Sequence, residues 1–158
     1  MSPLAERVVH LARERRVTVA TAESCTGGLI AAALTDVPGA SEVFGFGLVT
    51  YADEAKSALL GVPAAVIAVH GAVSAEVAGA MAEGAARLAG AEATVAVTGI
   101  AGPGGGSAQK PVGLVWFGLY ARGAVRTERR VFAGLDRDGV RQASVEAALI
   151  LLTEALSA

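Results

Sequence analysis

Residues 23–28, with the sequence ESCTGG, are the strongest candidate for a reactive site in the chain. They lie between a predicted buried strand and a predicted helix. Their hydroxyls would therefore face the carboxyl edge of a sheet, while N–H groups at the helix start could hold an anion. A structural role is also open, in which Thr26 caps the helix and Ser24 fills the turn. The Gly-x-Ser-x-Gly elbow of α/β-hydrolases is absent, because Ala22 and Thr26 flank Ser24.

Two further side chains could serve a nucleophilic reaction. Cys25 is a rival nucleophile, although a single thiol at the end of an apolar strand is more often a small buried hydrophobe. Lys56 lies in the first turn of a predicted helix, where the positive end of the helix dipole disfavours the ammonium form. A neutral lysine can act as a base, but lowering its pKa from 10.4 to near 7.5 requires roughly 4 kcal/mol from burial or a nearby cation. Otherwise Lys56 is a solvated surface charge.

Residues 99–110, GIAGPGGGSAQK, form a glycine-rich loop that looks superficially like a phosphate loop. The spacing fails both known patterns, since Lys110 follows Gln109 rather than glycine and the third glycine of a dinucleotide fingerprint falls on Ser107. The glycines would still let the main chain approach a ligand with its N–H groups free. A flexible surface loop is the alternative.

Arg137 and Arg141 are four residues apart at the start of the last predicted helix, and so share one face. Two arginines can hold a phosphate. The alternative is a charged helix start that makes surface ion pairs. Asp136 and Asp138 resemble the start of a calcium loop, but Arg141 replaces the glycine required at its sixth position.

The elements that must position these side chains alternate along the chain, which predicts one α/β domain over residues 1–158 with a mixed sheet. Ser2, Asp53 and Ser74 are expected to cap helices. Strands are predicted at 17–22, 43–51, 93–98, 112–121 and 124–132, the last two as a hairpin around residues 122–123. Helices are predicted at 3–15, 29–34, 54–60, 75–88 and from 136 onward, with a short one after residue 63.

The amino-acid composition and net charge exclude several classes of protein. Hydrophobic residues at 53% exclude disorder, and a net charge of −2 provides no basic field for nucleic acid. One cysteine, Cys25, and two separated histidines make a zinc site unexpected and fit a reducing compartment. No apolar run approaches the ~18 residues of a membrane span. We therefore expect a soluble cytoplasmic protein without a membrane segment, nucleic-acid partner or metal.

Several motifs occur together in one order: TAESCTGG at 21–28, VTYADEAK at 49–56, HGAVS at 70–74, TGIAGPGGG at 98–106 and KPVGLVWFGL at 110–119. Across essentially the whole chain they resemble the C-terminal domain family of the competence/damage-inducible protein CinA, whose stand-alone members are nicotinamide mononucleotide amidohydrolases. The resemblance implies a three-layer α/β/α fold. It also implies hydrolysis of the carboxamide of nicotinamide mononucleotide to nicotinate mononucleotide and ammonia in pyridine-nucleotide salvage, without a cofactor.

The resemblance also assigns roles to residues. It makes Ser24 the nucleophile and Lys56 its activating base, with Tyr51 nearby to orient or share the proton. We expect the developing oxyanion to be held by backbone N–H groups of residues 25–27, namely Cys25, Thr26 and Gly27. The nucleotide would be bound by Thr98, Gly99, Gly102, Gly104, Gly105, Arg137 and Arg141, the last on the 5′-phosphate.

Two departures from the family pattern matter. Leu135 is an apparent insertion before Asp136, and it could displace Arg137 and Arg141 by part of a turn. Longer family members also carry a molybdopterin-binding-like domain associated with cleavage of ADP-ribose, and we expect no such activity from residues 1–158. A second hypothesis is a catalytically silent module that binds a nucleotide or a protein partner in competence or the DNA-damage response. A homodimer is expected, because the alanine-rich helix at 75–88 permits close contact. Packing within the chain is the alternative explanation of these alanines.

Overall fold

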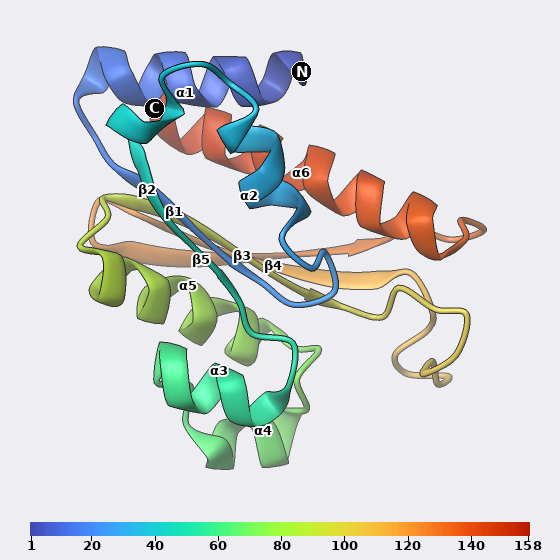
Figure 1. The fold of residues 1–158 in the computed structure, drawn as a ribbon. Coiled ribbons are helices and arrows are strands. Elements are labelled where there is room, and N and C mark those ends of the chain that lie inside the picture. The colour runs from blue at the N-terminus through green and yellow to red at the C-terminus, as the bar shows by residue number, and fades with distance from the viewer.

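The computed structural model describes all of residues 1–158 and is built around a five-stranded sheet (Figure 1). The strand order is β2-β1-β3-β4-β5, with β1 parallel to β2 and β3, and with β4 antiparallel to both β3 and β5. The prediction of a mixed sheet is therefore confirmed. The strands are β1 (Val19–Glu23), β2 (Phe44–Val49), β3 (Ala93–Gly99), β4 (Leu114–Ala121) and β5 (Ala124–Val131).

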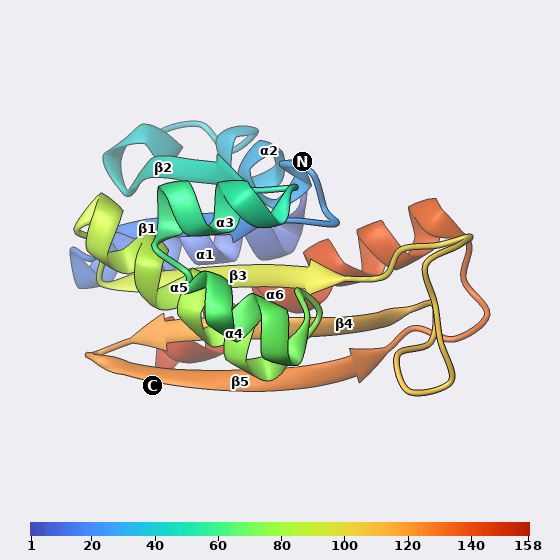
Figure 2. The ribbon, with the colours of Figure 1, turned by 90° about the horizontal axis from the view of Figure 1, so that it is seen from below.

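Helices cover both faces of the sheet, which confirms the three-layer α/β/α arrangement (Figures 1 and 2). One layer holds α1 (Pro3–Arg15), α2 (Leu29–Thr35) and α6 (Arg137–Ser157). The opposite layer holds α3 (Asp53–Leu60), α4 (Ala64–His70) and α5 (Ala75–Ala89). A short 3-10 turn, η1 (Ala40–Glu42), leads into β2.

The strands differ in burial according to their place in the sheet. All five residues of β1 are buried, because neighbouring strands and both helical layers enclose it. Strand β5 is a charged edge strand, and most of its residues are exposed. The helix α5 lies unusually close to the sheet, since a Cβ on Gly118 of β4 would come within 2.0 Å of the Ala78 carbonyl oxygen. Glycine and alanine are thus what allow this layer to pack closely.

The predicted elements are all present, with ends that differ by a few residues. Ser74 caps α5 by accepting the N–H of Val77, as predicted. Ser2 occupies the position before α1, as predicted, but its hydroxyl makes no capping hydrogen bond. The cap predicted at Asp53 is wrong, because Asp53 lies inside α3, whose preceding residue is an alanine. Asp136 precedes α6 and caps it through Gly139 N–H, so α6 begins at the next residue despite the apparent insertion.

The topology brings three loops to one edge of the sheet. The carboxyl ends of the parallel strands β1, β2 and β3 lead into residues 24–28, 50–52 and 100–113 respectively. Ligands of parallel α/β sheets bind at this edge. No helix of the structure is both long and apolar enough to cross a membrane.

Candidate active site

Ser24 and Lys56 meet at this edge, one from the turn after β1 and the other from the first turn of α3. Lys56 Nζ lies 3.2 Å from Ser24 Oγ. The lysine side chain is 1% exposed, and Ser24 is 8% exposed. Lys56 is therefore not a solvated surface charge, which excludes that alternative.

Two main-chain carbonyls hold the Lys56 amine. Nζ donates to Thr50 O at 2.9 Å and to Tyr51 O at 3.2 Å. A neutral amine has two N–H groups and one lone pair. As an ammonium, Lys56 would donate its third N–H group to Ser24 Oγ, and Nζ lies at donor distance from that oxygen. In the neutral amine the two carbonyls accept both N–H groups, and the lone pair then faces the Ser24 hydroxyl. Burial lowers the pKa of Lys56 below its ordinary value of 10.5, which favours this neutral form.

Asp53 opposes the effect of burial, and sequence reasoning missed it by treating the residue as a helix cap. Its Oδ1 lies 3.7 Å from Lys56 Nζ, and its carboxylate raises the lysine pKa. The Asp53 side chain is 55% exposed, so water screens the attraction. The spacing from Asp53 to Lys56, one helical turn, was the signal in the sequence.

The turn after Ser24 carries main-chain N–H groups without partners. The N–H of Ser24 donates to Val97 O at 2.9 Å, and that of Gly27 donates to Ser24 O at 3.0 Å. The N–H groups of Cys25 and Thr26 donate to no protein group. The prediction for Gly27 therefore needs correction, because its donor is used within the turn. The Thr26 hydroxyl is also unpartnered, so it does not cap α2.

Glu23, the last residue of β1, holds the same turn through hydrogen bonds to the start of α2. Its carboxylate is fully buried and accepts the N–H groups of Ile30 and Ala31, each at 2.9 Å. These are first-turn donors of α2, whose own N-cap residue, Gly28, has no side chain to satisfy them. Sequence reasoning assigned Glu23 no role, although a carboxylate at the end of a buried strand was the available signal.

A cavity of about 290 Å³ opens beside the serine and lysine. It contains the predicted substrate-binding residues of the glycine-rich loop, together with Thr98 and Arg137. The Thr98 hydroxyl donates to Ala72 O at 2.9 Å and so joins β3 to the segment before α5. The lining residues are Ser24, Cys25, Tyr51, Asp53, Lys56, Ala72, Val73, Thr98, Gly99, Ile100, Ala101, Gly102, Gly104, Gly105 and Arg137.

The two arginines of α6 have different surroundings. Arg137 donates to Gly102 O at 2.7 Å and to the Tyr51 hydroxyl at 3.1 Å, and it lines both the serine cavity and a neighbouring one of about 650 Å³. Arg141 lines only the neighbouring cavity. Its Nε donates to Cys25 O and its Nη2 to Thr26 O, both at 3.2 Å. Neither arginine forms an ion pair, so the alternative of surface ion pairs is wrong.

Tyr51 meets Lys56 differently from what was expected. Its main-chain carbonyl accepts from Nζ, whereas its phenol contacts Arg137 and its side chain is largely exposed. The expectation that Tyr51 orients or shares the proton stays a prediction for its phenol, which here accepts a hydrogen bond from Arg137. Tyr51 holds the amine through its backbone and forms part of the cavity wall through its ring.

Cys25 lies next to the serine but is unsuited to be the nucleophile. The residue is 5% exposed, and burial raises the pKa of its thiol to about 11. The reactive form of cysteine is the thiolate, which is scarce at neutral pH under these conditions. The interpretation of Cys25 as a small buried residue agrees with this environment.

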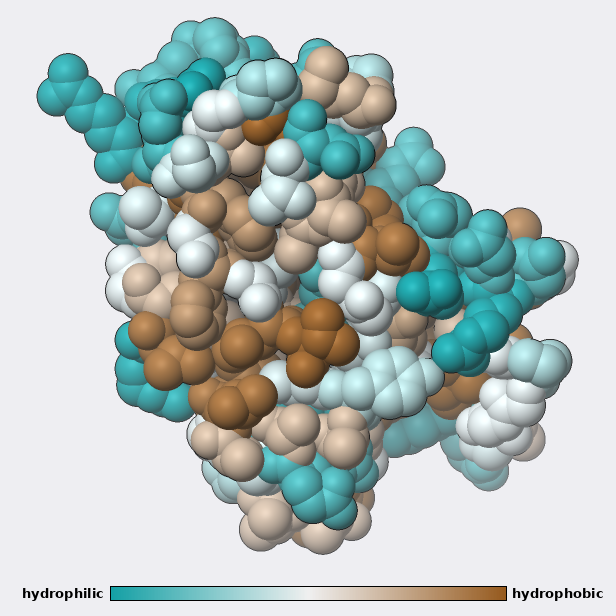
Figure 3. All heavy atoms as spheres, viewed as in Figure 1, coloured by the Kyte–Doolittle hydropathy of each residue, from teal (hydrophilic) through white to brown (hydrophobic).

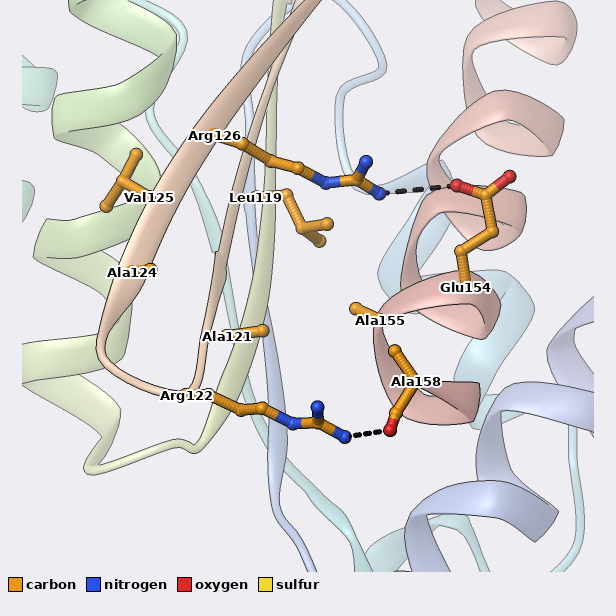
Figure 4. A pocket seen from close by; sticks show the side chains of 9 residues that line it. All are labelled: Leu119, Ala121, Arg122, Ala124, Val125, Arg126, Glu154, Ala155 and Ala158. Atoms are coloured by element: carbon orange, nitrogen blue, oxygen red, sulfur yellow. Dashed lines mark hydrogen bonds and ion pairs between the residues drawn. The ribbon is translucent and has the colours of Figure 1, made fainter.

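A further cavity of about 370 Å³ lies at the opposite end of the sheet, between the β4–β5 hairpin and the end of α6 (Figure 4). Arg126 pairs with Glu154 across it at 3.2 Å, and Arg122 contacts the carbonyl of Ala158. Its other lining residues are aliphatic, and it contains no hydroxyl or thiol nucleophile. This cavity therefore lacks the nucleophile that the cavity at the carboxyl edge of β1 and β3 contains.

Comparisons with known proteins agree with this architecture. The family model described as CinA C-terminal domain matches residues 1–156. A CinA-like protein of Geobacter sulfurreducens is 55% identical over 90% of the chain, and one of Akkermansia muciniphila is 54% identical over 94%. The matches cover 34% and 36% of those two proteins, so the chain spans about a third of the length of these curated relatives.

Solved structures give the same result. The competence/damage inducible protein CihA from Agrobacterium tumefaciens superposes with a TM-score of 0.94 at 47% identity, covering 98% of this chain and 94% of that one. A CinA superfamily protein from Klebsiella pneumoniae gives 0.92 at 41% identity, covering 98% and 96%.

Proposed function

The chain belongs to the CinA C-terminal domain family, and from this premise we propose that it is an amidohydrolase that deamidates nicotinamide mononucleotide with Ser24 as nucleophile and Lys56 as base. The observation that carries the proposal is the buried amine, 3.2 Å from the serine hydroxyl and held by two carbonyls. A nucleophile and a base within hydrogen-bond reach are the minimum for covalent amide hydrolysis.

In the proposed reaction, Ser24 Oγ attacks the carboxamide carbon while its proton passes to Lys56 Nζ. The oxyanion that develops is stabilised by the N–H groups of Cys25 and Thr26, which have no protein acceptor. As the C–N bond breaks, Lys56 gives the proton to the leaving nitrogen and ammonia departs. Water then attacks the acyl-serine, Lys56 takes the water proton, and that proton returns to Ser24 Oγ as the carboxylic acid product leaves.

The cavities support a nucleotide as substrate. The serine cavity, about 290 Å³, suits the ring that bears the carboxamide, and Arg137 lines both this cavity and the larger neighbouring one. We propose that the ribose and phosphate extend past the glycine-rich loop toward Arg137. Its guanidinium already donates to Gly102 O and the Tyr51 hydroxyl, so it is held in place before the phosphate arrives.

The proposal is tested by measuring ammonia released from nicotinamide mononucleotide by the purified protein, Ser24→Ala and Lys56→Met. We expect release by the unmodified protein and a loss of about 10³-fold or more in each variant. Arg129→Lys, a change at an exposed position on β5, is the matched control. Nucleotide binding without ammonia release by the unmodified protein would favour the silent binding module instead.

The homodimer remains a prediction, and the free edge of the sheet supports it. Strand β2 (FGFGLV) has no charged residue or proline, and its Val49 is 46% exposed. In Figure 3 apolar residues gather across the middle of the face on which β2 lies, while the right-hand side is mostly hydrophilic. Such an unprotected edge is a site for pairing with another strand. Light scattering gives the mass in solution, and a monomer at all concentrations would contradict the prediction.

A further inference from the structure

We propose that Arg141 is a positioning residue that orients the peptide groups of the oxyanion site, rather than a ligand of the substrate phosphate. The proposal rests on the proposed function, because it concerns the same serine and the same N–H donors. It starts from the contacts of Arg141, whose Nε and Nη2 donate to the carbonyls of Cys25 and Thr26 at 3.2 Å each.

A carbonyl contact fixes an N–H group because a trans peptide is planar and its C=O and N–H point in opposite directions. The Cys25 carbonyl and the Thr26 N–H belong to one such plane. By holding the Cys25 carbonyl, Arg141 directs the Thr26 N–H away from its own side of the turn. Arg141 lines the neighbouring cavity and not the serine cavity, so this direction leads away from the neighbouring cavity.

The adjacent peptide plane is fixed by the same principle. The Ser24 carbonyl accepts the Gly27 N–H at 3.0 Å, and the opposite end of that plane is the Cys25 N–H. Both unpartnered donors therefore lie on planes whose carbonyls are already held. One plane is fixed within the turn itself, and the other depends on a side chain 116 residues further along the chain.

The charge of Arg141 adds to this geometric effect. A cation bound to a carbonyl polarises the peptide and strengthens the N–H at its other end as a donor. Arg141 is half-buried and has no carboxylate partner within an ion-pair distance, so its charge is not neutralised by another side chain. Its five N–H groups are also partly committed to the turn, which reduces what it can offer a phosphate.

The test compares Arg141→Lys and Arg141→Gln on two substrates, nicotinamide mononucleotide and the riboside without the phosphate. A positioning role predicts that kcat falls about 10²-fold on both substrates with KM little changed, since an oriented oxyanion donor is worth about that much. Arg141→Lys keeps the charge but loses the fork of the guanidinium, and we expect it to retain more activity than Arg141→Gln. A loss confined to the phosphorylated substrate and expressed in KM would overturn the proposal.

A second readout does not depend on the substrate. An alkyl fluorophosphonate forms a bond from Ser24 Oγ to phosphorus as fluoride leaves and the hydroxyl proton passes to Lys56 Nζ, and its phosphonate oxygen occupies the oxyanion position. We expect both Arg141 variants to be labelled at least 10-fold more slowly than the unmodified protein, with Arg129→Lys as control and circular dichroism to verify folding. If the unmodified protein releases no ammonia, the proposed function fails, and the labelling rates still decide the role of Arg141. Unchanged labelling in folded variants would overturn it.

Discussion

Asp53→Asn is expected to move the pH dependence of the reaction toward lower pH. The variant keeps the shape of the side chain but removes the negative charge that lies 3.7 Å from Lys56 Nζ. That carboxylate raises the pKa of Lys56, against the dominant lowering by burial. Without the carboxylate, the lysine pKa falls further and the neutral amine becomes available at lower pH. The rising limb of kcat/KM, which reports the free enzyme, follows it.

The size of the shift follows from Coulomb's law. Two unit charges 3.7 Å apart interact by about 1.1 kcal/mol at the dielectric constant of water and by about 4.5 kcal/mol at an effective value of 20. Because the Asp53 side chain is 55% exposed, the value near that of water applies. Since 1.36 kcal/mol corresponds to one pKa unit, we expect a downward shift of about 0.8 unit.

The assay is the rate of ammonia release across pH for the unmodified protein, Asp53→Asn and the control Glu54→Gln. Glu54 is the next residue on the same exposed turn, but it forms no ion pair with Lys56 and is the smallest of the influences that raise its pKa. Its replacement should shift the limb by less. Titration of the Lys56 amine by nitrogen NMR gives the same quantity without a substrate. If the rising limb of kcat/KM in Asp53→Asn stays at the same pH or moves to higher pH, the assignment of Lys56 as the base is refuted.

Three further predictions concern stability, measured by chemical denaturation. Glu23→Gln leaves one of two buried N–H donors facing an amide NH₂ and should cost about 1–3 kcal/mol, more than the same change at the exposed Glu83. Gly118→Ala places a Cβ 2.0 Å from a carbonyl oxygen and should cost at least about 1–3 kcal/mol, whereas Gly45→Ala, with open space around it, should stay within about 0.5 kcal/mol. Lys56→Met removes a buried amine whose lowered pKa makes its charged form costly in the folded state. The free energy of unfolding of Lys56→Met minus that of the unmodified protein should therefore be highest at pH values below the pKa of Lys56 in the folded protein. This difference should decline as the pH rises toward the ordinary lysine pKa of 10.5. A difference that grows with pH would contradict the prediction.

The fold could be predicted because its signals are local. A short β-branched strand such as residues 93–98, a cap such as Ser74 and a turn such as Arg122-Gly123 each carry their own pattern within a few residues. The meeting of the three loops also follows from parallel strands ending at one edge. The resemblance to the family then selected Ser24 and Lys56 from among several polar residues.

The contacts that the sequence did not reveal are made between distant residues. Arg141 was assigned to a phosphate, yet its partners are carbonyls more than a hundred residues earlier. Main-chain groups carry no signature in the sequence, so the use of the Thr50 and Tyr51 carbonyls by Lys56 could not be foreseen. Glu23 looked like one more polar residue of a motif until the position of α2 showed which donors it satisfies.

Cys25, next to the proposed nucleophile Ser24, is poorly reactive toward oxidants. Peroxides and alkylating agents attack thiolates, and a cysteine with a pKa of about 11 offers almost none at neutral pH. Its 5% exposure further limits access by such reagents. If the proposed serine–lysine hydrolysis is correct, we expect the activity to persist under oxidising conditions that inactivate thiol-dependent enzymes.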